Sequence, residues 1–297
     1  MRISRSGNLT LIVRHTAVIV VAAACASQSA QRGAGANDGV RSLIAAERAF
    51  ARHSERAGIK ESFIANLGSD GLLFRPGPVN GLNWLNTHPA AKGYLSWDPE
   101  VAAISSSGEL GFTTGPWEFR AAGPKDSVSG AGHYVTVWKR DSTRTWKMAV
   151  DIGTSHRWMA KPEDAVGSVI SRASTLGAEA QEQLFARDSA VGRGAPQSAS
   201  LLGVMAEDAR AHREGEVPAL GIENVRRAFA GDDRPYHSTR LGGGISRAGD
   251  FGYTYGEYEL VASFTHPAQR GYYLRLWRQD ENAWRVILDL AQPARAQ

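Results

Sequence analysis

The chain repeats part of its own sequence at a spacing close to the length of a domain. Residues 108–118 read G-E-L-G-F-T-T-G-P-W-E, and residues 249–259, which begin 141 positions later, read G-D-F-G-Y-T-Y-G-E-Y-E. A repeat is identified before any local pattern, because missing it assigns the wrong fold. A period this long predicts a tandem duplication of a whole domain rather than a solenoid of short units.

The similarity extends on both sides of this motif. Residues 132–139 match 271–278, and residues 146–151 match 284–289. At the opening of the second copy we align residues 182–189 with residues 47–54. The chain has a single cysteine, which excludes an internal disulfide framework. Each copy has about 120 residues, enough to build a core of its own.

The first 25 residues have the composition of an export signal. Arg2, Arg5 and Arg14 precede a short apolar run at 17–24, which is too short to span a bilayer. Cys25 follows three alanines, and this pattern resembles a bacterial lipoprotein signal in which the cysteine is lipidated. The alternative is ordinary cleavage after Ala-x-Ala, which removes Cys25 or leaves it free. We expect an exported protein, periplasmic or anchored by lipid in a bacterial cell envelope, with a flexible tether at 26–39.

The net charge of +4 comes mostly from this signal. Removing its three arginines leaves 31 of the 34 basic side chains against 30 acidic ones. The rest of the chain contains no run of Lys or Arg that would form the basic face needed to bind nucleic acid. We therefore exclude nucleic acid as a partner, and we expect contact with a membrane only through the lipid anchor.

Each copy is predicted to begin with helices and to end with strands. Apolar positions recur near the helical period from residue 40 to residue 67, and four segments rich in aromatic and β-branched residues follow after residue 100. In the last strand, simple alternation puts Trp146, Met148 and Val150 on one face and Asp151 on the other. This order predicts an α+β fold with helices packed on one face of a curved sheet. We assign domains to residues 40–158 and 176–292, a linker to 159–175 and a tail to 293–297.

The two copies share three strand motifs, G-x-x-G-x-T-x-G-x-[WY]-E, G-x-Y-x-x-x-W-[KR] and W-[KR]-x-x-x-D. With an N-terminal amphipathic helix before them, they resemble the nuclear transport factor 2-like superfamily, in its SnoaL-like and ketosteroid-isomerase-like branch. The resemblance implies two tandem cone-shaped domains, each a strongly curved, mostly antiparallel sheet wrapped around N-terminal helices. It also implies that the two domains pair as an internal pseudo-dimer. It does not fix an activity, because this scaffold supports both enzymes and binding proteins.

Three titratable residues are candidates for catalysis. Asp151 and Asp289 occupy the same place in the two copies, and a carboxylate desolvated inside a cone could transfer protons. Alternatively, each aspartate caps a turn or pairs with an arginine at the end of its strand. His133 is the third candidate. Its counterpart is Tyr272, a phenol with a much higher pKa, so the two cannot share a proton-transfer role.

The aromatic residues divide into those that recur and those that do not. Trp138, Trp146, Trp277 and Trp284 recur, and we interpret them as packing residues. The candidate ligand-binding residues are those specific to one copy, namely Trp84, Tyr94, Trp97 and Trp117 in the first and Tyr255, Tyr272 and Arg275 in the second. They make the first cone the more aromatic of the two, and the alternative is that they simply fill it.

No motif for a metal, a nucleotide or a covalent nucleophile is found, so we expect no cofactor and no metal. We interpret the run 242–244, three glycines, as a turn before a strand rather than as a phosphate-binding loop. The first hypothesis is therefore a protein that binds a small, largely apolar molecule in a conical pocket. The alternatives are a cofactor-independent acid–base enzyme (an isomerase, cyclase or dehydratase) and a protein–protein interaction module.

Overall fold

The computed structural model of the protein describes residues 38–159, 166–170, 179–281 and 283–294. The predicted signal with Cys25, most of the tether, much of the linker and the end of the tail lie outside these residues. Among the described helices, none is long and apolar enough to cross a membrane.

The first half begins with a helix over residues 38–57, which buries one face. Val40, Leu43, Phe50 and Ala51 lie on that face, and so does Glu47, whose side chain is fully buried. The elements that follow are α2 (Ile59–Asn66), β1 (Leu67–Phe74), β2 (Pro78–Asn80), α3 (Gly81–Thr87), β3 (Tyr94–Trp97), β4 (Val101–Ile104), β5 (Leu110–Arg120), β6 (Gly130–Arg140), β7 (Trp146–Ser155) and β8 (Gly167–Ile170).

The second half follows a similar order, with shorter first and second helices and with β9 between them. Its elements are α4 (Ala180–Ala190), β9 (Arg193–Pro196), α5 (Gln197–Leu202), β10 (Met205–Arg213), β11 (Ala219–Leu220), α6 (Ile222–Ala228), β12 (Pro235–Ile245), β13 (Phe251–Leu260), β14 (Gln269–Asp280) and β15 (Ala283–Pro293).

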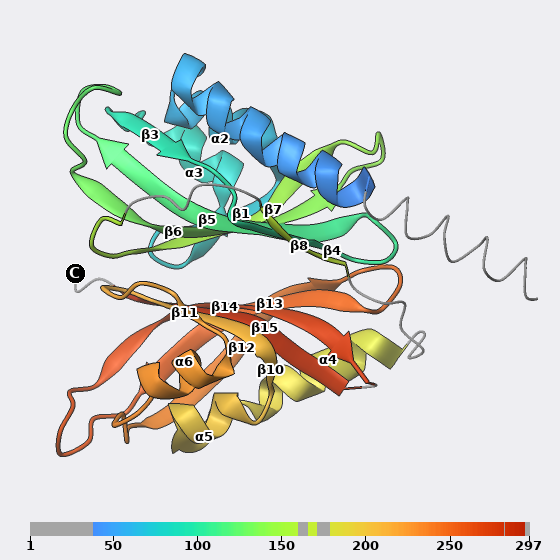
Figure 1. Cartoon of the computed structure of the whole chain (residues 1–297), viewed down its shortest axis with the longest axis vertical. Coiled ribbons are helices and arrows are strands. Elements are labelled where there is room, and N and C mark those ends of the chain that lie inside the picture. Colours follow the sequence, from blue (N-terminus) through green and yellow to red (C-terminus); the bar gives the residue numbers. More distant parts are fainter. Residues whose placement is uncertain (1–37, 160–165, 171–178, 282, 295–297) are drawn as a thin grey trace, which may run out of the picture.

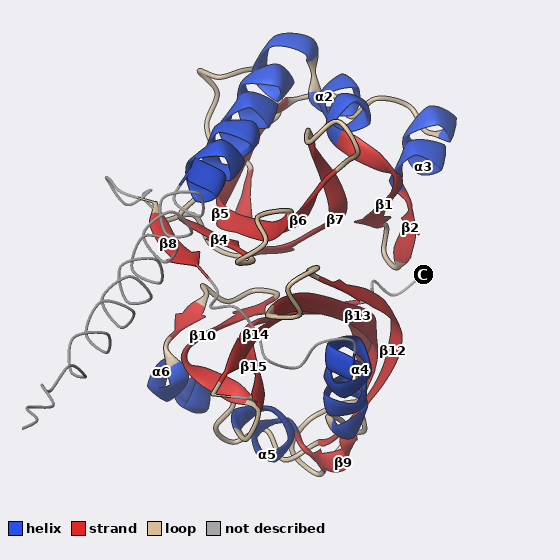
Figure 2. Cartoon of the chain, turned by 90° about the vertical axis from the view of Figure 1, so that its right-hand side faces the viewer, coloured by secondary structure: helices blue, strands red, loops and turns tan. Residues whose placement is uncertain are grey.

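The two sheets share the topology of their central strands and differ at one edge, where β8 pairs parallel with β4 and β9 pairs antiparallel with β12. Their strand orders are β2-β1-β7-β6-β5-β4-β8, with β3 beside β5, and β11-β10-β15-β14-β13-β12-β9. The last three long strands of each copy pair antiparallel, while β1 and β10 pair parallel with β7 and β15. Each sheet curves around its own helices (Figure 2). The predicted α+β class, with two curved sheets, is confirmed.

Two local predictions are wrong. Part of the predicted linker forms β8, which pairs parallel with β4. The run 242–244 lies inside β12 and is not a turn. A Cβ at Gly242 would meet the ring of Tyr255, and one at Gly244 would meet the ring of Tyr253. Glycine at these positions lets the two tyrosine rings lie directly on the neighbouring strand.

The two sheets pack against each other and the helices cover their outer faces (Figure 1). One hydrophobic core lies between the sheets and draws residues from both halves, among them Val137, Ile152, Leu276 and Leu288. At this interface Phe112 and Phe251 stack, with ring centroids 6.1 Å apart and ring planes within 2° of parallel.

The contacts at one end of this interface are reciprocal. The backbone N–H of Ser106 donates to Asp250 Oδ2 at 2.8 Å, and the N–H of Arg247 donates to Glu109 Oε1 at 2.6 Å. The 141-residue spacing relates Ser106 to Arg247 and Glu109 to Asp250. When residue i contacts j and the equivalent of i contacts the equivalent of j, the interface has the geometry of a two-fold axis.

Candidate functional site

A β-bulge decides which way the aspartate of each closing strand points. Val137 pairs with Val150 and Trp138 pairs with Met148, so Ala149 has no partner on β6. An extra residue in one strand reverses the alternation of its side chains.

The predicted faces of β7 are therefore wrong. Trp146 and Met148 lie in the core beneath the first-half helices, whereas Val150 lies in the core between the sheets. Past the bulge, Asp151 takes the inner face and lines the first cone. The same shift occurs in β15, where Ile287 is the extra residue.

The first cone contains a cavity of about 370 Å³. Its walls come from the N-terminal helices, from β3, β5, β6 and β7, and from the end of β15 of the second half. The lining is largely aromatic, with a few polar groups. It consists of Phe50, Phe63, Phe74, Arg75, Leu95, Trp97, Trp117, Phe119, Gly130, Tyr134, Thr136, Asp151, Ile152, Gly153, Ser155 and Gln292.

Asp151 is the carboxylate of this cavity. Thr136, directly opposite on β6, donates its hydroxyl to Asp151 Oδ1 at 2.6 Å. Burial raises the pKa of Asp151 to about 6, against the opposing effects of the Thr136 hydrogen bond and the positive charge of Arg75. Near neutral pH this group can both accept and release a proton, which is the property a general acid–base needs.

A second carboxylate lies behind the aromatic wall. Glu47 accepts hydrogen bonds from Trp97 Nε1 at 2.6 Å, from Trp138 Nε1 at 3.0 Å and from the Thr113 hydroxyl. Burial raises its pKa to about 7, although these three hydrogen bonds lower it. Glu47 does not line the cavity, so its role is to hold Trp97 in the wall.

The second cone is filled by an ion network. Arg275 is fully buried and donates to Asp188 Oδ1 at 2.7 Å and to Asp289 Oδ1 at 2.9 Å. Arg213 donates to Asp289 Oδ2 at 2.6 Å, and the Tyr236 hydroxyl accepts from Arg275. With 1 % of its surface exposed, Asp289 reaches no solvent-filled space, which matches the alternative of a carboxylate paired with arginine.

The network also corrects the alignment of the two helices. Asp188 bonds Thr254, which accepts from Trp277 Nε1, just as Glu47 bonds Thr113 and Trp138. Asp188 therefore corresponds to Glu47, 141 residues earlier, and the alignment of 182–189 with 47–54 is wrong by six positions. Applying the 141-residue spacing of the strand motif to the helices pairs Glu47 with Asp188.

The candidate ligand-binding residues are dispersed. Trp97 and Trp117 line the first cavity. Trp84 of α3 stacks on His88, the residue that follows this helix, with ring centroids 4.2 Å apart. Tyr94 pairs with Arg120 at the start of β3.

The second-half candidates lie elsewhere. Tyr255 and Tyr272 pack edge-on against Phe74, with centroids 6.3 and 6.1 Å away, on the side of the interface between the sheets. Arg275 lies in the ion network. Sequence reasoning missed Phe50, Phe63, Phe74, Arg75, Leu95, Phe119, Tyr134, Thr136 and Gln292. Thr136 could have been found, because its strand directly precedes that of Asp151 and the two residues face each other across the β6–β7 hairpin.

His133 lies outside the cone, in the seam between the two halves. Its Nδ1 is 2.7 Å from His156 Nε2, and its Nε2 is 3.3 Å from Glu100 Oε2. The ring of His212, from the second half, packs edge-on with its centroid 5.6 Å from that of His133. Arg210 donates to the other oxygen of Glu100 at 3.0 Å. Hydrogen bonding to His133 is the largest cause of a Glu100 pKa lowered to about 2.

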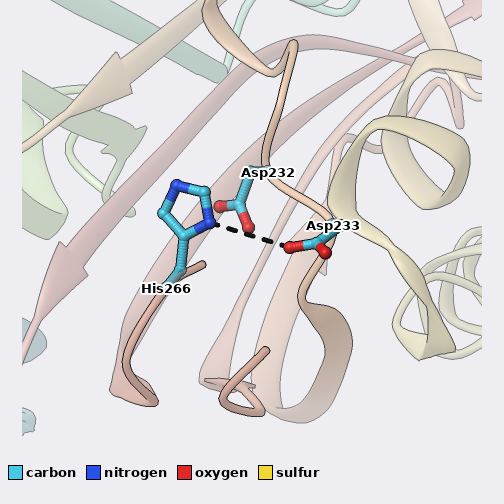
Figure 3. A group of neighbouring side chains, drawn as sticks. All are labelled: Asp232, Asp233 and His266. Atoms are coloured by element: carbon cyan, nitrogen blue, oxygen red, sulfur yellow. Dashed lines mark ion pairs between the residues drawn. The ribbon is translucent and has the colours of Figure 1, made fainter. Parts of the chain in front are cut away.

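One cluster within the described residues could offer three metal ligands, and it lies on the surface of the second half (Figure 3). Asp232, Asp233 and His266 place ligand atoms within 4.8 Å of one another. Both oxygens of Asp232 already accept hydrogen bonds from Arg234, at 2.9 and 2.7 Å. Asp233 Oδ1 accepts a hydrogen bond from Thr265 at 3.2 Å, and His266 Nδ1 lies 2.8 Å from the same hydroxyl. All three side chains are thus already held by neighbouring groups of the protein.

No family model matches the chain, and no curated protein matches it. Solved structures do match, each over about two fifths of the chain. One is a protein of unknown function with a cystatin-like fold from Nostoc punctiforme, 14 % identical over 41 % of this chain and 97 % of that chain, with a TM-score of 0.34.

Two more belong to the group that the strand motifs resemble. A ketosteroid isomerase-like protein from Erwinia carotovora atroseptica is 12 % identical over 40 % of this chain and 96 % of its own, with a TM-score of 0.33. An NTF-2 like protein of unknown function from Shewanella oneidensis is 13 % identical over 37 % and 93 %, with a TM-score of 0.29.

Proposed function

We propose that this protein binds one small, largely apolar molecule per chain in the cone of its first half. The observation that carries this proposal is the cavity of about 370 Å³, whose wall includes six Phe and Trp rings and the polar group Asp151. Concave sites lined by apolar side chains with a few placed polar groups are the usual form of small-molecule sites. The second cone, filled by Arg275, supports the assignment to one half only.

Native mass spectrometry of the mature protein purified from its own host tests this proposal. We expect one retained small molecule per chain. Gly130→Phe should abolish retention, because a Cβ at Gly130 would lie 3.6–3.7 Å from Trp117 and Phe119, inside the cavity wall. Gly123→Phe, in open space on the β5–β6 loop, is the matched control. An empty wild-type protein that also ignores a panel of hydrophobic ligands would overturn the proposal.

The second candidate is a cofactor-independent acid–base enzyme acting on the bound molecule. It is favoured by Asp151, whose pKa is raised to about 6 on the cavity wall. Tyr134 lines the same cavity, and burial raises its pKa well above the usual value, so it stays a proton donor. Once a turnover assay exists, Asp151→Asn should lower kcat by about 10²–10⁴-fold, while Asp289→Asn should leave the chemistry intact. Unchanged turnover in Asp151→Asn would end this candidate.

We further propose that the chain is an internal pseudo-dimer exported to the cell envelope. The reciprocal hydrogen bonds of Ser106 and Arg247 support the first part. Export and lipidation rest on the sequence of the first 25 residues alone. Labelling with a radioactive fatty acid should mark the wild-type protein and leave Cys25→Ser unlabelled. An unlabelled wild type, or equal labelling of both, would contradict lipidation of Cys25.

A further inference from the structure

The cavity of the first half combines aromatic rings with one carboxylate. Six Phe and Trp rings line it, and Asp151 is the acidic residue of the lining. The face of an aromatic ring carries negative partial charge, and it attracts a cation more strongly when both are removed from water. A cavity of this composition receives negative potential from its rings as well as from its carboxylate.

One oxygen of this carboxylate is unpaired and accessible. Among the described residues, only Thr136 donates a hydrogen bond to Asp151, and it does so to Oδ1. Asp151 is half-buried, and its Oδ2 is not one of the unpaired polar atoms that are shielded from solvent. The ion pairs of the described residues do not include Asp151, whereas its counterpart Asp289 has two. Oδ2 can therefore accept a partner that enters the cavity.

A second carboxylate makes the aromatic wall more negative. Glu47 accepts the indole N–H of Trp97 at 2.6 Å from behind the wall, and its charge polarises that ring. Burial, with a smaller contribution from the charge of Asp151, raises the pKa of Glu47 to about 7. At pH 8 both carboxylates are thus largely ionised, while burial raises the pKa of the Tyr134 phenol and keeps it neutral.

The positive charge of the lining is more exposed than the carboxylates. Arg75 is the basic residue of the lining, and it is exposed to solvent. Its Nη1 donates to the Phe74 carbonyl at 2.7 Å, and its guanidinium carbon lies 5.4 Å from the centre of the Trp84 ring, which does not line the cavity. Because water screens an exposed charge more than a buried one, Arg75 offsets the potential of the two carboxylates only in part.

We infer that the first-half pocket selects an organic cation, an apolar molecule that carries an ammonium group. An N–H of the ammonium donates to Asp151 Oδ2, and the positive charge lies against the aromatic faces, that of Trp97 among them. Asp151 is then a specificity-determining residue of the pocket, and its ionised form is the one that binds. The inference rests on the proposed function, namely that the cavity binds a small molecule.

The test uses two probes of nearly the same shape. One is 2-naphthylmethylamine, an ammonium ion at pH 8, and the other is 2-naphthylmethanol, which is neutral. Both can donate a hydrogen bond, so they differ in charge. Calorimetric titration at pH 8 should show the ammonium ion bound about tenfold more tightly. Asp151→Asn keeps the shape of the side chain and an acceptor for Thr136. It should remove this preference, with the affinity for the alcohol changed by less than about twofold.

The preference should also follow the ionisation of Asp151. With a pKa of about 6, about a tenth of this carboxyl stays ionised at pH 5, so the affinity for the ammonium ion should fall about tenfold between pH 8 and pH 5. The affinity for the alcohol should stay constant. Asp151→Asn should lose most of the pH dependence, and the remainder belongs to Glu47, which titrates in the same range.

Asp70→Asn makes the same chemical change at an exposed residue of β1 that does not line the cavity, and it should leave both affinities unchanged. Equal affinities for the two probes in the wild type, or a preference that survives in Asp151→Asn, would overturn the inference while leaving the proposed function standing. An equal loss for both probes in Asp151→Asn would make Asp151 a purely structural residue and overturn it too. No binding of either probe would contradict the proposed function itself.

Discussion

At the scale of single residues, the partner across the strand decides what an equivalent aspartate does. Asp151 faces Thr136, which supplies one hydrogen bond and leaves the carboxyl on a cavity wall. Asp289 faces Arg275, which supplies a full charge and fills the cone. The exchange of threonine for arginine thus separates a candidate acid–base group from a structural ion pair.

Asp151 should destabilise the fold at neutral pH. Its folded pKa of about 6 lies above the unfolded value of about 3.9, so the stability it contributes is present at low pH and is lost as pH rises through 6. Asp151→Asn keeps the acceptor for Thr136 and removes the charge. The free energy of unfolding of this variant, measured by urea denaturation, should exceed that of the wild type by about 2–3 kcal/mol at pH 8. This gain should vanish below about pH 4.

The matched control for this change is Asp70→Asn, at an exposed position in β1. It should show no such gain at pH 8. An Asp151→Asn protein less stable than wild type at pH 8 would show that the carboxylate is needed for folding rather than tolerated for function.

Arg275 should be among the most costly side chains to replace. Arg275→Thr copies the first repeat but leaves Asp188 buried without its strongest partner and Asp289 with Arg213 alone. Breaking a buried pair from one side costs about 3–5 kcal/mol, since a charge is left uncompensated. Arg270→Thr, an exposed arginine paired with Glu259, should cost less than about 1 kcal/mol. Equal unfolding free energies for the two variants would contradict the claim that the buried ion pairs of Arg275 stabilise the fold.

At the scale of elements, the succession of helices and strands along the chain could be predicted, and the direction of the side chains could not. Helix and strand periodicity located most elements, because one face of each is buried. The faces of β7 could not be predicted, because the extra residue Ala149 has no signature in its own sequence and shows only in the pairing with β6. Glu47 had a signal that was overlooked, a charged residue on the apolar stripe of a helix.

The bulge provides a direct test at this scale. Deleting Ala149 removes the extra residue and leaves Met148, Val150 and Asp151 opposite their present partners on β6, so each keeps its face. We therefore expect the deletion to keep a cooperative transition, measured by circular dichroism on heating. Deletion of Ala262, in the exposed β13–β14 connection, is the control and should also leave a cooperative transition. An Ala149 deletion that no longer folds cooperatively, beside a folded Ala262 deletion, would contradict this assignment of the extra residue.

At the scale of the whole molecule, the seam between the halves should respond to acid. His212 lies buried beside His133, Arg210 and Arg213, and burial with these positive charges lowers its pKa well below 6.5. A lowered histidine pKa means that stability is lost as pH falls below the unfolded value.

Between pH 7.5 and pH 5 the wild type should lose up to about 2 kcal/mol of unfolding free energy through this histidine. His212→Leu should not show this loss. Urea denaturation at the two pH values measures the difference, with His237→Leu on exposed β12 as the control. Equal losses of unfolding free energy in the wild type and in His212→Leu would contradict this prediction, because protonation of His212 would then not affect stability.

The repeat predicted two copies of one fold, and periodicity alone could not show that one cone holds a cavity and the other an ion network. Gln292 illustrates the reason. It reaches the first cavity from the other half of the chain, so no pattern within one repeat contains the site. A cavity formed across a duplication becomes visible only when both halves are placed in space.

The proposed function places the bound molecule in the cone of the first half and not in the cone of the second, which is closed by Arg275. A crystal of the protein soaked with 6-bromo-2-naphthol tests it through the anomalous signal of bromine. We expect a single bromine peak per chain, enclosed by Trp97, Trp117 and Asp151. A peak beside Arg275 in the second cone, or no peak within the first, would contradict it.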